Sequence, residues 1–135
     1  MKKRISDEVL YRKACEAREL AYCPYSQVSV GAALLTKSGK IYTGANIENA
    51  AFSPSVCAER VAIFKAINDG ETEFSKIAVA GGNKDNGEKP NFVPCGVCRQ
   101  VMAEFCGEDF EIVLAKDKSL KFSDILPFGF NKELL

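Results

Sequence analysis

The sequence predicts an α/β fold, a three-layer α-β-α sandwich in which a single mixed sheet of about five strands carries helices on both faces. The first observation behind this prediction is the order of hydrophobic patterns, which reads α, β, β, α, β, α, β, β along the chain. The second is the length of 135 residues, which is enough to bury roughly two-thirds of the unfolded surface in one core but too short for two cores. We therefore expect a single domain over residues 1–135.

The first half of the chain predicts two helices and a β-hairpin. Ser6, followed by two acidic residues, is typical of a helix start, and the apolar stripe that follows includes Leu20. Gly39 lies in a short loop between two β-rich runs. Residues 61–64 are apolar on every side of the second helix, which indicates burial on more than one face, and a partner subunit is one way to supply it. In order, we expect a helix over 6–22, strands over 28–36 and 40–46, and a helix over 56–69.

The second half predicts strands and helices around a polar loop. This loop, residues 81–94, is rich in Gly, Asn and Lys. The helix that follows it begins at a Cys-x-x-Cys motif. In order, we expect a strand over 76–80, a helix over 95–106, strands over 111–115 and 120–123, and a helical turn over 123–126.

Charge and hydropathy exclude several classes of protein. The 18 basic and 18 acidic residues cancel, so the chain lacks the basic footprint of a nucleic-acid binder, and we expect a small or uncharged partner. No apolar run approaches the ~20 residues that a membrane helix needs, so no membrane is expected as a partner. Residues 1–8 pass into an amphipathic pattern without an apolar signal segment, so the six cysteines indicate reduced thiols in the cytoplasm.

The absence of histidine narrows the possible chemistry. It excludes Ser-His-Asp and Cys-His nucleophiles and any imidazole metal ligand. Cys95 and Cys98 form a Cys-x-x-Cys at a helix start, a spacing that lets two thiolates of one turn hold the same ion. The motif alone fits a redox pair, half of a structural zinc site or two buried cysteines.

The best candidate for a third thiol ligand is Cys57. Cys106 lies eight residues beyond Cys98, which is roughly 12 Å further along the helix, so Cys106 cannot share the ion. Cys15 and Cys23 are typical of ordinary buried or half-buried thiols. Cys57 follows a break and opens a helix, so we expect it to be a ligand, with a core cysteine as the alternative.

The two residues Glu59 and Arg60 suit a catalytic rather than a structural zinc site. Three thiolates leave the divalent ion with a net negative charge, which Arg60 would reduce by donating to the sulfurs; a surface ion pair is the alternative. Three protein ligands leave a fourth position for water, the arrangement of catalytic sites. Glu59 would carry the proton of this water, and a solvated carboxylate in the first helical turn is the alternative.

Two motifs resemble those of a known family. Residues 57–60 (Cys-Ala-Glu-Arg) and 94–100 (Pro-Cys-Gly-Val-Cys-Arg-Gln) are similar to the zinc motifs of the cytidine deaminase family in its small three-cysteine form. The resemblance implies one Zn²⁺ per chain, held by Cys57, Cys95 and Cys98. It also implies hydrolytic deamination of cytidine and deoxycytidine to the uridine forms, as in pyrimidine salvage. A zinc-bound hydroxide would attack C4, with Glu59 acting first as base and then as acid.

The resemblance also implies how a nucleoside is bound. Asn46 and Glu48, one residue apart at a strand end, would hold the ribose 3′-hydroxyl, although residues in such places also simply meet solvent. Ala58 would contribute to the substrate site. The family forms homotetramers with shared active sites, in which the residue that matches Phe130 reaches into a neighbour's pocket. The alternative is that Phe130 anchors the tail on its own subunit.

Two departures from the family pattern leave the exact substrate open. Val28 occupies the position of a phenylalanine that stacks on the pyrimidine, and the loop over 82–92 is longer than the usual connection. Loss of this aromatic platform would weaken base binding by ~1 kcal/mol or mark a modified substrate. A blasticidin-type deaminase is therefore the nearest rival. A non-catalytic zinc module and a thiol redox protein are the alternatives outside the deaminases.

Overall fold

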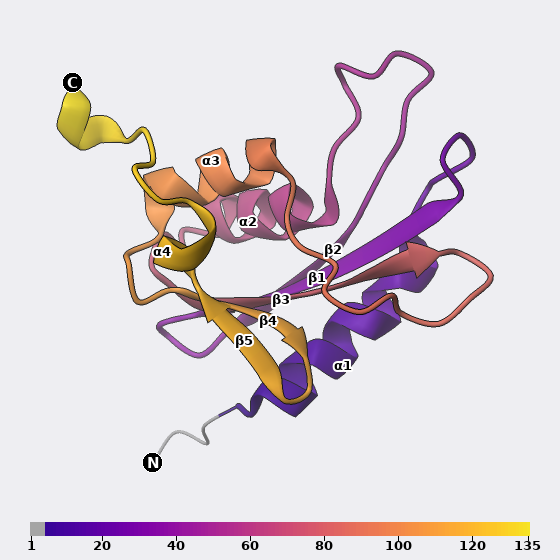
Figure 1. Ribbon diagram of the computed structural model, residues 1–135, viewed down its shortest axis with the longest axis horizontal. Coiled ribbons are helices and arrows are strands. Elements are labelled where there is room, and N and C mark those ends of the chain that lie inside the picture. Colours follow the sequence, from indigo (N-terminus) through magenta and orange to yellow (C-terminus); the bar gives the residue numbers. More distant parts are fainter. Residues whose placement is uncertain (1–4) are drawn as a thin grey trace.

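The computed structural model describes residues 5–135 and has one five-stranded sheet at its centre (Figure 1). The strands are β1 (Val28–Thr36), β2 (Ile41–Ala45), β3 (Phe74–Asn83), β4 (Glu111–Ala115) and β5 (Lys118–Lys121). The α-helices are α1 (Asp7–Ala17), α2 (Ala58–Asn68), α3 (Gly96–Phe105) and α4 (Phe122–Ile125). Residues 1–4 lie outside the described residues. They form the first half of residues 1–8, for which the sequence predicts no signal segment.

The sheet is mixed, as predicted. Its strand order is β2-β1-β3-β4-β5. Neighbouring strands are antiparallel except β3 and β4, which run parallel and are connected through α3. A parallel pair needs a crossover connection, and the helix that carries the Cys-x-x-Cys motif provides it.

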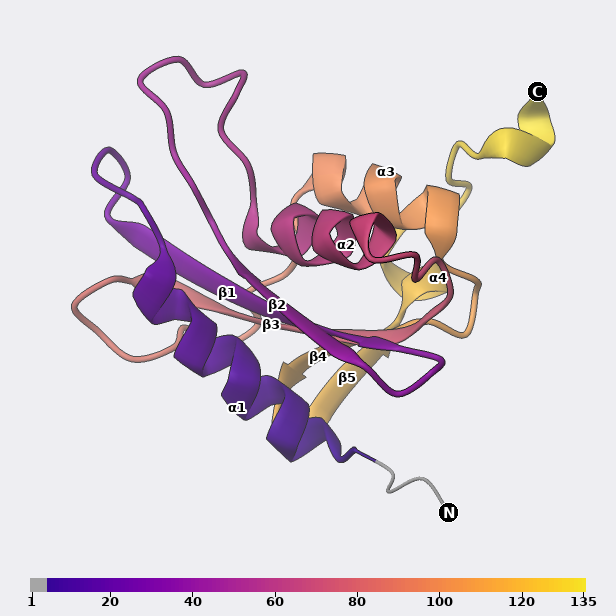
Figure 2. The same cartoon turned by 180° about the vertical axis from the view of Figure 1, so that it is seen from behind.

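Helices cover both faces of this sheet (Figure 1 and Figure 2). On one face lies α1, whose Leu10 and Ala14 pack against β1, β3 and β4. On the other face lie α2 and α3, which enclose the larger core around Ile63, Met102 and Phe110. The predicted three-layer sandwich is therefore confirmed. None of the helices within residues 5–135 is long and apolar enough to cross a membrane.

Two glycines in the strands allow the helices to approach the sheet closely. A Cβ atom built on Gly31 of β1 would run into the carbonyl oxygen of Ala14 in α1. A Cβ atom on Gly44 of β2 would lie 2.6 Å from the carbonyl oxygen of Ala58, in the first turn of α2. Glycine weakens a strand interior, so its presence here indicates that close backbone approach takes priority. The absence of a side chain at Gly44 therefore sets the short distance between the start of α2 and the sheet.

The apolar segment of α2 is covered only in part. Ala62 and Ile63 are fully buried, whereas Phe64 is 43% exposed. The prediction that this segment is buried is therefore confirmed within the single chain for Ala62 and Ile63. Phe64 remains on the surface.

The first helix ends earlier than its apolar stripe predicts. A 3₁₀ helix, Arg18–Leu20, follows α1. Leu20 is 81% exposed and Arg18 is buried, the reverse of the predicted pattern. The tighter 3₁₀ turn changes the direction of the following side chains, so they leave the α-helical stripe. The predicted cap is confirmed, because the hydroxyl of Ser6 accepts a hydrogen bond from the amide of Val9 at 3.2 Å.

Strand β3 extends beyond the predicted strand over 76–80. It pairs with β1 from Phe74 to Asn83, so Gly81 and Gly82, assigned by composition to a loop, belong to the strand. The ladder to β1 holds these glycines extended despite their low strand propensity. Smaller shifts occur near the C-terminus, where β5 and α4 begin earlier than the predicted strand over 120–123 and turn over 123–126.

Arg18 fastens the loop after β3 to the rest of the fold. Its Nε donates to the carbonyl and hydroxyl oxygens of Ser29, both at 3.1 Å. Its Nη2 donates to the carbonyl oxygens of Asn83 at 3.0 Å and Asn86 at 3.4 Å. Its Nη1 lies 3.3 Å from a carboxylate oxygen of Glu88. A buried guanidinium is stable only when its donors are satisfied in this way, so Arg18 ties the loop over 84–95 to β1.

Replacement of Arg18 by leucine is expected to lower the free energy of unfolding by about 3 kcal/mol, because it leaves several buried acceptors without a donor. Urea denaturation followed by circular dichroism measures this change. Arg18→Lys, which keeps the charge but offers fewer donors in a different geometry, should lose less. A loss below about 0.5 kcal/mol in Arg18→Leu, the range of ordinary surface substitutions, would contradict the anchoring role.

Candidate active site

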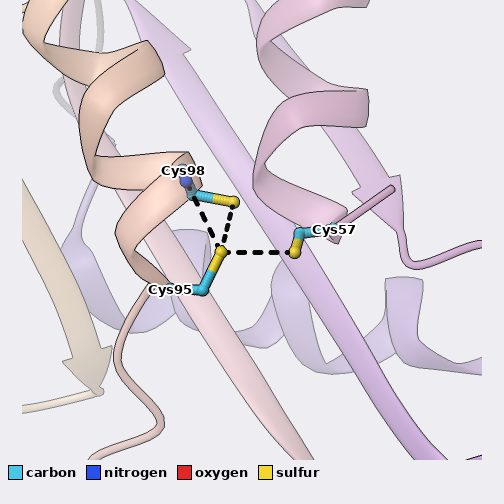
Figure 3. Close-up of side chains that lie close together, drawn as sticks. All are labelled: Cys57, Cys95 and Cys98. Carbon is cyan, nitrogen blue, oxygen red and sulfur yellow. Dashed lines mark hydrogen bonds between the residues drawn. The ribbon is translucent and has the colours of Figure 1, made fainter. Parts of the chain in front are cut away.

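The N-termini of α2 and α3 meet on one face of the sheet. Cys57 and Cys95 are the N-cap residues of the two helices, and both have extended backbone. Cys98 lies in the first turn of α3, and its amide donates to Sγ of Cys95 at 3.5 Å. Figure 3 shows the three side chains pointing toward one another from the two helix ends. The fold thus brings together the three predicted ligands, although the two N-cap residues, Cys57 and Cys95, are 38 residues apart in the sequence.

The three sulfur atoms have the spacing of a tetrahedral metal site. Sγ of Cys95 lies 3.5 Å from Sγ of Cys57 and 3.5 Å from Sγ of Cys98. All three sulfurs lie within 4.8 Å of one another. A zinc ion bound to each thiolate at ~2.3 Å would separate the sulfurs of a tetrahedral site by roughly 3.8 Å. The donor set therefore fits zinc. Within residues 5–135, the remaining cysteines lie outside this group: Cys15, Cys23 and Cys106.

Positive charge beside the sulfurs favours the thiolate form. Nη2 of Arg60 donates to Sγ of Cys57 at 3.5 Å, as the spacing of three residues predicts. The hydrogen bond with Cys98, followed by that with Arg60, lowers the pKa of Cys57 to about 5. The hydrogen bond with Cys57, followed by burial, raises the pKa of Cys98. Nε of Arg60 is buried and has no partner among the described residues, so this guanidinium has a further donor for the anionic group.

Glu59 is buried in the first turn of α2. Its side chain is only 3% exposed, which rules out the alternative of a solvated carboxylate. Burial, with a smaller contribution from the neighbouring charge on Cys57, raises the pKa of Glu59 to about 7. A carboxyl group with this pKa gains and loses a proton readily near neutral pH, which is what a general acid and base requires.

A cavity of about 470 Å³ opens beside the sulfurs, within the usual range of small-molecule sites. Its lining includes most of the predicted site residues: Val28, Asn46, Glu48, Cys57, Glu59, Arg60 and Cys95. Ala58 is fully buried, and its side chain is not part of this lining. Phe130 is 56% exposed and does not line the cavity of its own described chain. A larger hollow of about 700 Å³, at the opposite end of β1, contains none of the predicted site residues.

Asn46 and Glu48 stand at one side of the cavity but have different surroundings. The side-chain amide of Asn46 bonds to β1, accepting from the amide of Val30 at 2.8 Å and donating to the carbonyl oxygen of Val28 at 2.9 Å. Glu48 accepts from the amide of Ser26 at 3.1 Å and also from the hydroxyl of that residue. These hydrogen bonds, the hydroxyl first, lower the pKa of Glu48.

Sequence reasoning missed two aromatic residues of this lining, Phe52 and Phe92. Phe52 is 90% exposed and lies in the segment between β2 and α2. Phe92 is partly buried against the larger core and comes from the loop between β3 and α3. The available signal was the position of Phe92 only three residues before Cys95, because so short a connection keeps the backbone of Phe92 near the site.

The fold and the site together define a class of protein. Three thiolates offer a metal ion one open position, and the carboxyl group of Glu59 is buried beside them. Without histidine in the chain, this carboxyl is the group suited to move protons. The class is a metal-dependent hydrolase with a single carboxyl proton carrier.

Comparison with known proteins is more specific. Residues 4–114 match the family model described as the cytidine and deoxycytidylate deaminase zinc-binding region. The chain belongs to this family of zinc-dependent hydrolytic deaminases. The cytidine deaminase of Halalkalibacterium halodurans is 44% identical over 130 residues, covering 93% of this chain and 95% of the relative. The probable cytidine deaminase of Dictyostelium discoideum is 42% identical over 124 residues, covering 89% of this chain and 80% of the relative.

Solved structures agree with this assignment. The crystal structure of cytidine deaminase from Burkholderia pseudomallei superposes with a TM-score of 0.83 at 39% identity, covering 93% of this chain and all of the other. The cytidine deaminase structure from Mycobacterium tuberculosis gives a TM-score of 0.82 at 31% identity, covering 94% of this chain and 98% of the other. The resemblance noted from the sequence motifs is therefore confirmed at the level of the family and the fold.

Proposed function

We propose that this protein is a cytidine deaminase, which hydrolyses cytidine and deoxycytidine to uridine and deoxyuridine and releases ammonia. The observation that carries the proposal is the buried carboxyl of Glu59 beside three clustered sulfurs, on the wall of a cavity large enough for a nucleoside. Identity of 44% to a cytidine deaminase and of 42% to a probable cytidine deaminase supports the choice of substrate. The blasticidin-type alternative has no comparable support.

The reaction replaces the amino group of the pyrimidine with oxygen. Water adds to C4, and the bond between C4 and the amino nitrogen then breaks, so the products are the uridine form and ammonia. Zinc, when bound by Cys57, Cys95 and Cys98, supplies the acidity of the attacking water, whose pKa falls toward ~7. Glu59 takes one proton from the water and passes it to N3. It then takes the second proton, from the hydroxyl now on C4, and delivers it to the amino nitrogen as the bond from C4 to that nitrogen breaks and the C4 carbonyl forms. A pKa of about 7 lets one carboxyl perform both roles.

Arg60 has a supporting role in this scheme. Three thiolates would give the divalent ion a net negative charge, which would weaken its effect on water. The hydrogen bond from Arg60 to Cys57 withdraws electron density from one sulfur, and the free Nε donor is available to another. Arg60 thereby keeps the site acidic enough for the reaction.

The charges around the cavity favour a neutral nucleoside over its monophosphate. The charged residues of the lining are Glu48, Glu59 and Arg60. Two of them are acidic, and Arg60 is already engaged with Cys57. A phosphate group would therefore meet carboxylates without an available cation, which is unfavourable.

The direct test is ammonia release from a panel of cytidine, deoxycytidine, blasticidin S, cytosine and cytidine monophosphate. The expected result is rapid release from the two nucleosides and slow release from the other three. Absence of ammonia from cytidine in a preparation with full zinc content would overturn the proposed function. Preferential release from blasticidin S would favour the rival deaminase instead.

For the sugar, Glu48→Ala is expected to raise KM for cytidine about tenfold and to lower kcat/KM by at least as much, because a hydroxyl of the ribose loses its charged acceptor. The lowered pKa of Glu48 keeps this acceptor ionised at neutral pH. Steady-state kinetics with cytidine and with free cytosine measures the effect, and cytosine should remain a poor substrate for both proteins. If the wild type processed cytosine as well as cytidine, Glu48 would not be a sugar ligand.

Asn46→Ala addresses the same proposal less cleanly. The side chain of Asn46 bridges two backbone groups of β1, so its removal should also lower stability. We place Asn46 at the sugar through the remaining hydrogen-bonding capacity of its amide. A raised KM in this variant indicates a lost sugar contact only if the melting temperature shows that the protein is still folded.

We also propose that the active sites are shared within a homotetramer. Exposed apolar side chains on α2, α3 and the C-terminal segment support this assembly: Phe64, Val97, Phe128 and Phe130. The C-terminal segment extends away from the body of the chain (Figure 1), and its hydrogen bond to the body joins Nε2 of Gln100 to the carbonyl oxygen of Phe130 at 2.8 Å. This bond uses the backbone and leaves the ring of Phe130 available to a neighbouring subunit.

Sedimentation is expected to show a tetramer, and Phe130→Ala is expected to raise KM for cytidine about fivefold with unchanged zinc content, because an aromatic contact to the base is lost. The kinetics are measured at protein concentrations where the oligomer is intact. A monomer with full activity at assay concentration would contradict the shared site.

The cellular role that follows is pyrimidine salvage in the cytoplasm. Free cytidine and deoxycytidine are recovered as uridine nucleosides by this reaction. None of the six cysteines, all of which lie within the described residues, forms a disulfide, which supports a reducing compartment.

A further inference from the structure

The wall of the cavity nearest the start of β1 lacks an aromatic residue on the strand itself. Val28 and Val30 line the cavity from β1. Two phenylalanines complete the lining, but Phe52 is 90% exposed at its edge. Phe92 alone of these two packs against the larger core. A pyrimidine ring needs a flat apolar surface to lie on, so the location of Phe92 matters for substrate binding.

The ring of Phe92 lies directly on the backbone of β3. A Cβ atom built on Gly81 would be 2.6 Å from Cδ1 and 2.7 Å from Cε1 of that ring, so any side chain at position 81 would force the ring to move. Gly81 is paired with Val30 in the antiparallel ladder, so the ring takes the place that a side chain at position 81 would occupy beside Val30. Val28 lies two residues from Val30 and therefore on the same face of β1.

The loop that carries Phe92 is held at several points. The amide of Lys84 donates to the carbonyl oxygen of Gln27 at 2.9 Å, and the amide of Lys89 donates to the carbonyl oxygen of Gly81 at 2.8 Å. The contacts of Arg18 with Asn86 and Glu88 hold the same loop. Nζ of Lys118 contacts Asn91, directly before Phe92. The ring is thus positioned before any ligand binds, which limits the entropy lost on binding.

We propose that Phe92 is the residue on which the pyrimidine stacks in this protein, and that the longer loop moves this aromatic surface from position 28 to β3. The proposal rests on the proposed function and specifies how its substrate is held. The absence of a side chain at Gly81 leaves room for the ring of Phe92, and Val28 lines the same cavity from β1. In this proposal Phe92 replaces the aromatic ring that is missing at position 28, so its absence there does not indicate a modified substrate.

The test is a double-mutant cycle between Phe92→Leu and Val28→Phe, measured as KM and kcat for cytidine. Phe92→Leu retains apolar volume on Gly81 but removes the π surface, so KM should rise about tenfold with little change in kcat. Val28→Phe should lower KM in the Phe92→Leu background by about threefold or more, and should bring no gain when Phe92 is present. Zinc content and melting temperature of each variant establish that the fold is intact.

An unchanged KM in Phe92→Leu would overturn the proposal. Equal effects of Val28→Phe in both backgrounds would overturn it as well, because they would show that Phe92 only packs the loop. Either result would leave the proposed function standing, since the wild-type enzyme would still release ammonia from cytidine. Failure of the wild type on cytidine would instead overturn the proposed function.

Discussion

Glu59→Gln is expected to lower kcat for cytidine by about 100 to 10,000-fold while zinc remains bound. The substitution preserves the shape of the side chain and removes its ability to take up a proton. Burial leaves little room for another group to replace it, because the side chain is 3% exposed. Glu59 is also the titratable group of the cavity with a pKa of about 7, so no neighbour is equally suited to the role.

The measurement is single-turnover and steady-state loss of cytidine absorbance, with zinc determined in the same samples. Glu48→Gln is the matched control, because it makes the same change to the other carboxylate of the cavity and leaves the proton carrier in place. KM should change in the control, whereas kcat should fall far more in Glu59→Gln. Near-normal turnover in Glu59→Gln would show that another group transfers the proton.

Cys57→Ala is expected to abolish stoichiometric zinc binding and to reduce activity at least as strongly as Glu59→Gln. Two ligands in one turn of α3 are too few for the ion, since catalytic zinc sites use three protein ligands. The loss should be accompanied by a lower melting temperature, because a bound metal stabilises only the folded chain. Arg60 would in addition be left without the sulfur to which it donates.

Metal analysis after dialysis, with a thermal melt of each sample, measures this prediction. Cys106→Ser is the matched control, since Cys106 ends α3 and lies outside the sulfur group. This control should retain one zinc per chain. Stoichiometric zinc in Cys57→Ala would refute the three-thiolate site.

Local patterns in the sequence were sufficient for most of the fold. The cap at Ser6 and the β-rich runs before and after Gly39 are determined by neighbouring residues, and the structure agrees with them. The exposure of Leu20 and the burial of Arg18 were not predictable in this way. The burial of Arg18 depends on partners that are all at least 11 residues away, which helical periodicity cannot reveal.

The chemical centre of the site was also more accessible to sequence reasoning than its walls. Cys95, Cys98 and Glu59 owe their positions to helix starts, which short motifs reveal. Phe92 lies in a loop, where side-chain direction depends on tertiary contacts and has no periodic signal. The role proposed for Phe130 came from the family resemblance alone, and within the described chain this residue does not line the pocket.

The close approach of α2 to β2 has a consequence for engineering. Gly44 lies beneath the first turn of α2, two residues of which are Ala58 and Glu59, directly after the ligand Cys57. Designs for higher thermal stability commonly replace strand glycines with β-branched residues. Here such a change would displace the start of the helix and move the proposed zinc ligand Cys57 and the proposed proton carrier Glu59 together. A thermostable version of this enzyme must therefore keep Gly44 as though it were an active-site residue, although it never meets the substrate.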